Sequence, residues 1–227
     1  MRRSFKPSFP VSHTRIKICG ITRPEDALIA VANGADAIGL VFYAGSPRSV
    51  AADIAAEIAQ AVPPFVTVVA LFVDELAEEI ERILSLVSVD MIQFHGNEPA
   101  AFCGQFHRPW IKALRVRPGM DIEAACEEFS GARGVLLDSW QAGVPGGTGE
   151  TFDWRLAPDQ LRLPVVLAGG LHPGNVADAV CQVRPAAVDV SSGVERSPGI
   201  KDAEKIRQFI AAVRAAEQLR DETSHDD

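Results

Sequence analysis

The sequence lacks paired cysteines and long apolar runs. Its 4 cysteines, at positions 19, 103, 126 and 181, form no CxxC pair and show no Cys/His spacing of a zinc site. This pattern argues against a disulfide framework and a metal centre, and it suits a reducing compartment, so we expect a cytoplasmic protein. The apolar run that comes closest to the length of a membrane-spanning helix, Val66 to Val73, has only the length of a strand and ends at Asp74. We therefore expect no membrane association.

Positive charge is also scarce. The 22 lysines and arginines are outnumbered by 30 aspartates and glutamates, which gives a formal net charge of −8. Nucleic acids and anionic membranes require a basic face on their partner, so both are excluded as broad partners. An anionic small molecule remains compatible, because backbone N–H groups at helix starts bind phosphate without an excess of lysine.

The length of 227 residues suits one domain. Residues 1–14 contain Pro7 and Pro10 and no apolar segment of a secretory signal, so we expect a disordered or irregular extension. Residues 219–227 are polar and predict a disordered tail. Residues 15–218 show no break in composition and are interpreted as one catalytic domain.

Short apolar runs alternate with helical patterns throughout this domain. The runs are Arg15–Cys19, Ala37–Phe42, Val66–Val73, Asp90–Phe94, Ile111–Arg115, Gly134–Asp138, Val165–Gly169 and Ala187–Ser191. Continuous apolar strands followed by amphipathic helices indicate a parallel sheet covered by helices. Eight such repeats predict an α/β fold, a single (β/α)8 TIM barrel. A doubly wound open sheet is the alternative, but it usually has fewer units and a GxGxxG after its first strand, which is missing here.

The helices have start signals of unequal strength. Thr22 and Glu25 have the spacing of a capping box, and Ser49 is expected to open the second helix. The segment Asp153–Leu161 is the weakest predicted helix, because it is short and contains Pro158.

The active site of such a barrel is built at the carboxyl ends of its strands. Cys19 ends the first strand and is followed by Gly20 and a capped helix start, which would favour its thiolate. A free cysteine is more often a small buried hydrophobe. The three other cysteines lie in predicted helices and are given no role. Asp138 ends the sixth strand, where it is either a pocket carboxyl, able to act as an acid, or a cap for the next loop.

Further candidates lie at the same strand ends. Glycine pairs at Gly169–Gly170 and Ser192–Gly193 fit ordinary turns, but the loops after the last two strands are the usual phosphate site of this fold. Arg48 is either a solvated surface charge or a residue whose planar guanidinium binds a carboxylate. His95 fits a hydrogen-bonding residue, a general base or a loop histidine, and its neighbours do not decide between these.

Ordered motifs cover residues 15–210. They are Lys17-Ile-Cys-Gly-Ile-Thr22, Gly39-Leu-Val-Phe-Tyr43, Ser46-Pro-Arg-Ser49, Gln93-Phe-His-Gly96, Leu137-Asp138, Gly146-Gly-Thr-Gly149, Phe152-Asp-Trp154, Gly169-Gly-Leu171 and Asp189-Val-Ser-Ser-Gly-Val-Glu195. Together and in this order they resemble the phosphoribosylanthranilate isomerase family. Phe94 and Ala168 depart from the residues usual there, Leu and Ser, without touching the candidate acid and base.

The resemblance implies the third-step isomerase of tryptophan biosynthesis, which acts on a phosphorylated small molecule. It implies that Cys19 is the general base, Asp138 the general acid and Arg48 the holder of the anthranilate carboxylate. Seven further residues would contact or support the substrate: Gln93, His95, Gly169, Gly170, Asp189, Ser192 and Gly193. It implies no cofactor and no metal, and either a monomer or a homodimer.

Three rivals remain at this point. The histidine-pathway isomerase performs the same rearrangement but uses an aspartate where this sequence has Cys19, and activity toward its substrate stays open. Indole-glycerol-phosphate synthase would need lysines at strand ends that are not found. A non-catalytic phosphate-binding barrel should lack the acid or the base, and both are present.

Overall fold

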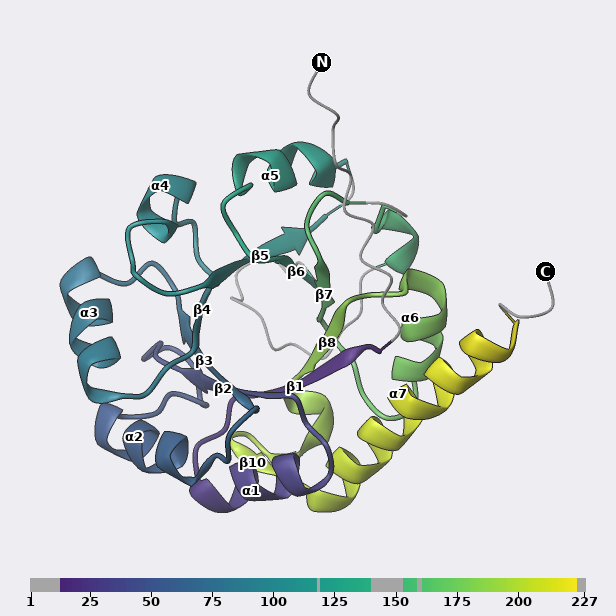
Figure 1. Ribbon diagram of the computed structural model, residues 1–227, viewed down its shortest axis with the longest axis horizontal. Helices are drawn as coiled ribbons and strands as arrows, with labels where there is room; N and C mark the ends of the chain where they lie inside the picture. The colour runs from purple at the N-terminus through teal and green to yellow at the C-terminus, as the bar shows by residue number, and fades with distance from the viewer. Residues whose placement is uncertain (1–12, 118, 140–152, 159–160, 224–227) are drawn as a thin grey trace.

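The computed structural model describes residues 13–117, 119–139, 153–158 and 161–223. Eight parallel strands close into a barrel in chain order, with β1 paired to β8 (Figure 1). The strands are β1 Arg15–Cys19, β2 Ala37–Val41, β3 Thr67–Phe72, β4 Met91–Phe94, β5 Trp110–Val116, β6 Val135–Ser139, β7 Val165–Leu167 and β8 Ala187–Val190. The prediction of a (β/α)8 TIM barrel is confirmed, and the open sheet is excluded.

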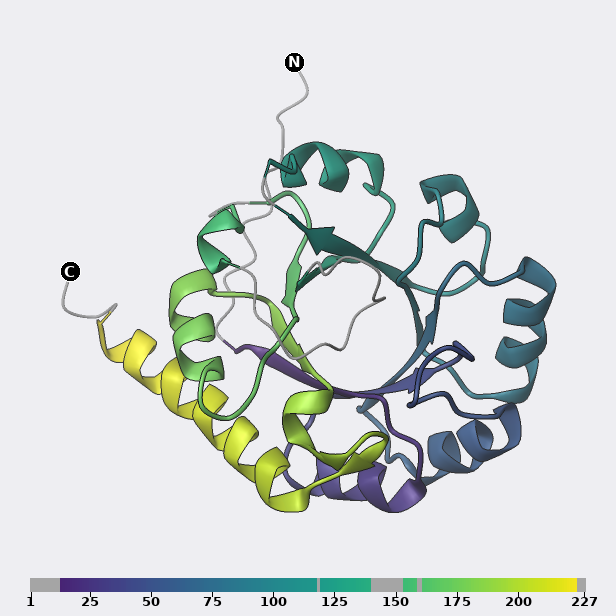
Figure 2. The same ribbon diagram turned by 180° about the vertical axis from the view of Figure 1, so that it is seen from behind.

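Helices surround the barrel on its outside (Figure 2). They are α1 Pro24–Ala32, α2 Ala52–Ala61, α3 Ala77–Leu86, α4 Ala100–Cys103, α5 Ile122–Glu128, α6 Val176–Val183 and α7 Ala203–Thr223. A short 3-10 turn η2, Ser192–Val194, and a hairpin of β9, Glu195–Ser197, and β10, Ile200–Lys201, connect β8 to α7. In place of the weak helix predicted at Asp153–Leu161, the described residues hold only the 3-10 turn η1, Trp154–Leu156.

Two predicted helix starts are wrong. The residue before α1 is Arg23, and Thr22 does not cap the helix because its hydroxyl donates to the carbonyl of Gly199, 2.6 Å away. Helix α2 begins only at Ala52, because Ser49 is drawn into a bridge with Val41 at the end of β2. In both cases a tertiary partner takes the residue that the local pattern assigned to a cap.

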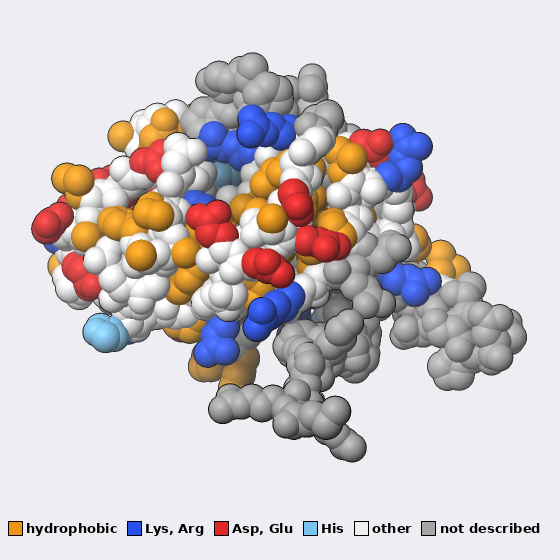
Figure 3. All heavy atoms as spheres, turned by 90° about the horizontal axis from the view of Figure 1, so that it is seen from above, with side chains coloured by type: hydrophobic (Ala, Val, Ile, Leu, Met, Phe, Trp, Pro, Cys, Tyr) orange, Lys and Arg blue, Asp and Glu red, His pale blue; other side chains and the backbone are white. Residues whose placement is uncertain are grey.

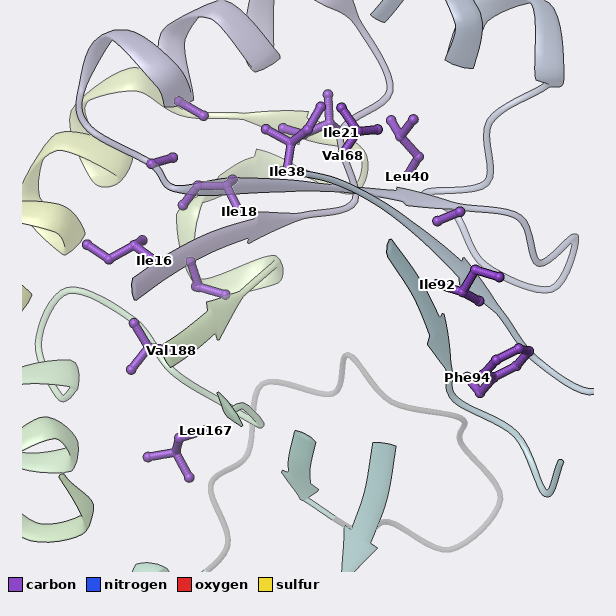
Figure 4. Close-up of a cluster of buried hydrophobic side chains, with 14 of the residues drawn as sticks. Ile16, Ile18, Ile21, Ile38, Leu40, Val68, Ile92, Phe94, Leu167 and Val188 are labelled. Atoms are coloured by element: carbon purple, nitrogen blue, oxygen red, sulfur yellow. The ribbon is translucent and has the colours of Figure 1, made fainter. Parts of the chain in front are cut away.

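The strands separate two layers of side chains. Ile16 and Ile18 of β1 belong to the large apolar cluster between strands and helices. Figure 4 shows part of this cluster, where Ile21, Ile38 and Val68 lie together although they come from different segments. Because side chains alternate along a strand, the residues between them, starting with Lys17, face the barrel interior. Residues of this inner set that lie near the carboxyl ends of the strands can therefore face a ligand at the barrel mouth.

The two ends of the domain contact each other at the amino-terminal end of the barrel strands. The backbone N–H of Thr14 donates to the buried carboxylate of Glu217 in α7, and Arg214 bridges Glu217 and Asp36. Helix α7 extends past the predicted boundary at 218 to Thr223, since no helix breaker follows in the sequence. Figure 3 shows acidic, basic and hydrophobic side chains interspersed over one face of the molecule.

Candidate active site

A pocket of about 100 Å³ lies at the carboxyl ends of the strands. All of the predicted site residues except Gly193 line it. Its other lining residues are Val41, Tyr43, Ser46, Leu71, Val73, Ala168, Leu171, Val190 and Ser191. The residues predicted at the strand ends therefore lie together, because closing the barrel brings eight strand ends to one mouth.

Cys19 lies at the pocket wall beside a buried ion pair. Lys17 and Cys19 are two residues apart on β1 and so share the inner face of the barrel. The ammonium Nζ of Lys17 is 2.9 Å from Oδ1 of Asp189, which is its direct neighbour on β8. All three side chains are less than a tenth exposed. A titrating thiol, a cation and an anion thus lie together away from bulk water.

The expectation that the Cys19 environment favours the thiolate is wrong in direction. Burial raises the pKa of the Cys19 thiol, and the negative charge of Asp189 adds to this. The charge of Lys17 and its hydrogen bond to the sulfur act in the opposite direction without overcoming burial. Helix α1 begins only at Pro24, five residues later.

Asp138 is held in place by two hydrogen bonds. Its Oδ1 accepts the backbone N–H of Ser139 at 2.9 Å, and its Oδ2 lies 3.0 Å from Nε2 of His95. The other ring nitrogen of His95, Nδ1, is 3.0 Å from the amide nitrogen of Gln93. With the amide in this orientation, Nδ1 accepts and Nε2–H donates to Asp138. Gln93 and His95, predicted as substrate contacts, thus also orient the candidate acid.

Arg48 is held by a buried carboxylate on the far side of its guanidinium. Its Nε and Nη2 each lie 2.8 Å from an oxygen of Glu195, and Lys201 Nζ is also 2.8 Å from Oε1. Burial acts to raise the pKa of Glu195, but the two cations hold that pKa below its usual value. The guanidinium is therefore held in position, and among the described residues no acceptor is bonded to its Nη1.

Comparisons with known proteins agree with this geometry. Residues 16–212 match the family model described as N-(5'phosphoribosyl)anthranilate (PRA) isomerase. An N-(5'-phosphoribosyl)anthranilate isomerase of Pseudomonas putida strain W619 is 60% identical over 206 residues, which are 91% of this chain and 100% of the relative. The crystal structure of the Thermotoga maritima phosphoribosyl anthranilate isomerase is 42% identical, has a TM-score of 0.83, and is matched over 89% of this chain and 100% of its own. The chain belongs to the phosphoribosylanthranilate isomerase family.

The glycines of this isomerase shape the part of the pocket that is formed by the loops after β7 and β8. A side chain at Gly169, whose φ is +81°, would meet Ser139 N at 2.5 Å and Asp138 Oδ1 at 2.9 Å. A side chain at Gly193 would overlap the carbonyl oxygen of Leu171. The loops after β7 and β8 therefore contact each other through their backbones, because these positions carry no side chain. Gly193 takes part in this contact without lining the pocket itself.

The sequence interpretation missed three charged residues of this isomerase, Lys17, Glu195 and Lys201. Lys17 could have been found, because it lies two residues before Cys19 on a strand and so on the same face. Glu195 was noted only as the end of the last motif, since its partner Arg48 is 147 residues away in the chain, and Lys201 acts through its bond to Glu195.

Two searches of the described part of the chain are negative. No group of three or more His, Cys, Asp or Glu side chains there could hold a metal ion. None of its helices has both the length and the apolar character needed to cross a membrane. The predicted glycine segment 146–149 lies outside the described residues.

Proposed function

We propose that this enzyme converts N-(5-phosphoribosyl)anthranilate to 1-(2-carboxyphenylamino)-1-deoxyribulose 5-phosphate, an Amadori rearrangement. One relative, a phosphoribosyl anthranilate isomerase 42% identical to this chain, has been crystallised with the reduced form of this product. The observation that carries the proposal is that a thiol on β1 and a carboxyl on β6 line one pocket from separate sides.

The rearrangement needs one acid and one base. Asp138, when protonated, donates its proton to the furanose ring oxygen, which opens the ring to a Schiff base. The Cys19 thiolate removes the proton from C2′, and the resulting enolamine tautomerises to the ketone. His95 and the backbone N–H of Ser139 orient Asp138 throughout, because they bond its two oxygens.

The two ends of the substrate would be held at different places in the pocket. The free edge of Arg48 is the binding group for the anthranilate carboxylate. The backbone N–H groups of Gly170 and Ser192 donate to no other described group and lie on the loops that the phosphate would occupy. Asp189 supports the pocket through its ion pair with Lys17.

The decisive experiment follows loss of anthranilate fluorescence while the substrate is generated and consumed in situ. We expect the purified protein to consume it, since the acid and the base are both in place. A folded protein that binds the phosphosugar yet leaves the fluorescence unchanged would contradict the proposed reaction and favour a binding barrel.

Arg48→Ala is expected to raise KM by about 10–100-fold with little change in kcat, since a hydrogen bond to a charged group is worth about 1.5–3 kcal/mol. Steady-state kinetics measure the two constants separately. Arg207→Ala is the matched control, because Arg207 pairs with Glu204 on exposed α7. A fall in kcat with KM unchanged would argue against carboxylate binding by Arg48.

Of the two expected states, monomer and homodimer, we infer the homodimer. Phe65 is fully exposed with a left-handed φ of 71°, and Leu86 is also exposed. Both precede strands, so they lie at the end of the barrel away from the pocket. One Thermotoga maritima relative is described as dimeric.

Phe65→Ser is expected to shift the enzyme toward monomer, because exposed apolar surface of this kind is stabilised by a partner. Size-exclusion chromatography with light scattering over a range of concentrations measures this. Leu28→Ser, on exposed α1, should leave the mass unchanged. A wild-type protein that is monomeric at every concentration would refute the homodimer.

We further infer a cytoplasmic location and a catalytic domain that extends the expected residues 15–218 to Thr14 and to the end of α7 at Thr223. All four cysteines are free thiols, as suits a reducing compartment. The residues that line the pocket lie between positions 19 and 192. Removal of residues 1–12 or 224–227 is expected to leave turnover unchanged.

A further inference from the structure

We propose that Lys17, held by Asp189, is the counter-ion of the Cys19 thiolate and so a positioning residue that sets the pH range of proton removal. The proposal rests on the proposed role of Cys19 as the base. It assigns a task to a buried ion pair that lies inside the barrel, where an apolar pair would otherwise fill the space.

The sequence makes room for this contact at Gly39. Gly39 is the direct neighbour of Cys19 on β2. A side chain built on Gly39 would place its first carbon 2.8 Å from Cys19 Sγ and 3.0 Å from Lys17 Nζ. Sulfur and ammonium therefore both border the space that any larger residue would fill. The absence of a side chain at position 39 lets the two groups approach each other.

The charged groups around Cys19 come from several elements. Lys17 lies on the same strand, Asp189 on β8 and Lys201 on β10. Lys17 and Lys201 stabilise a thiolate, whereas Asp189 and burial oppose it. Arg48, which is paired with Glu195, packs against Gly20, the residue after Cys19. The candidate acid Asp138, bonded to His95, also lines the pocket.

Lys17 meets the first requirement of a counter-ion, because it stays charged. Burial acts to lower the pKa of Lys17, but the negative charges of Asp189 and of an ionised Cys19 hold that pKa above its usual value. The ammonium is therefore charged at neutral pH. A buried thiolate without such a partner would be strongly disfavoured.

Asp189 gives Lys17 a partner in both states of the reaction. When Cys19 takes the proton from C2′, the sulfur becomes neutral and Lys17 keeps its 2.9 Å bond to Asp189. When the thiol loses that proton again, Lys17 lies between two anions. The cation is thus never left buried and unpaired, which would cost several kcal/mol.

The test titrates Cys19 directly. The ultraviolet absorbance of the thiolate is recorded against pH as the difference between each protein and the same protein carrying Cys19→Ser. This readout needs neither substrate nor access for a reagent. We expect Lys17→Met to move the midpoint upward by about 1–3 pH units, because an opposite charge nearby shifts a pKa by that amount.

Asp189→Asn should move the midpoint in the opposite direction, since it removes an anion from beside the sulfur. The double variant Lys17→Met/Asp189→Asn leaves no unpaired carboxylate, so it serves if Lys17→Met fails to fold. Its midpoint should stay above that of the wild type, because Lys17 acts on Cys19 more strongly than Asp189 does. The acidic limb of kcat/KM should follow the same order.

A merely structural pair gives a different result. Unchanged midpoints in both the double variant and Asp189→Asn, or shifts in the same direction for the two single variants, would overturn the proposal. A failure of the proposed function can be told apart from a failure of this proposal. In that case Cys19 of the wild type would titrate as expected, but the enzyme would leave the substrate unconsumed.

Discussion

Replacing Cys19 with alanine is expected to lower kcat/KM by about 10²–10⁴-fold, the range typical of one positioned acid or base. Cys19 is buried at the pocket wall, and alanine is smaller, so the fold should be retained. The loss should appear mainly in kcat, since the methyl group cannot accept the C2′ proton while the binding groups remain. The fluorescence assay under saturating and limiting substrate measures both constants.

The pH profile sharpens this prediction. Because burial raises the pKa of Cys19, its thiolate fraction increases tenfold per pH unit below that pKa. Wild-type kcat/KM should therefore rise with pH through neutrality, and the residual activity of Cys19→Ala should not follow that limb. Cys181→Ala, on α6 and exposed, is the matched control and should behave as the wild type. Full activity in folded Cys19→Ala would place the base elsewhere.

Asp138→Asn is expected to lower kcat by a similar factor of about 10²–10⁴, because an amide of the same size cannot donate a proton to the ring oxygen. Its carbonyl oxygen can still accept the backbone N–H of Ser139, and its amide group can donate to Nε2 of His95 once the proton of that ring moves to Nδ1. We expect KM to change little, because the proposed carboxylate and phosphate contacts are made by other residues.

Two measurements separate this loss of chemistry from a loss of structure. Thermal unfolding should place Asp138→Asn close to the wild type, and calorimetric titration with the product should give a similar affinity. Asp53→Asn, an exposed aspartate in the first turn of α2, is the control for the substitution. If product binding is lost together with turnover, Asp138 is a binding residue and the proposed acid lies elsewhere.

The sequence predicted the parts of the site that depend on strand position. Cys19 and Asp138 were found because each ends an apolar strand, and in a closed parallel barrel such ends converge. Arg48 was found in the same way, although its pairing with Glu195 was not. Local capping patterns failed at Thr22, whose hydroxyl donates to Gly199 far along the chain, and at Ser49, whose backbone forms a bridge with Val41.

The alternation of apolar strands and helices, and the order of the motifs, by themselves determined the barrel, the family and the end of the barrel that holds the pocket. Only the tertiary structure decided the electrostatics within it. Lys17 and Asp189 are 172 residues apart in the chain, and their pairing depends on the register of β1 against β8. The direction in which the pKa of Cys19 shifts likewise depends on the balance between burial and the nearby charges. Both are set by tertiary packing rather than by the neighbours of Cys19 in the sequence.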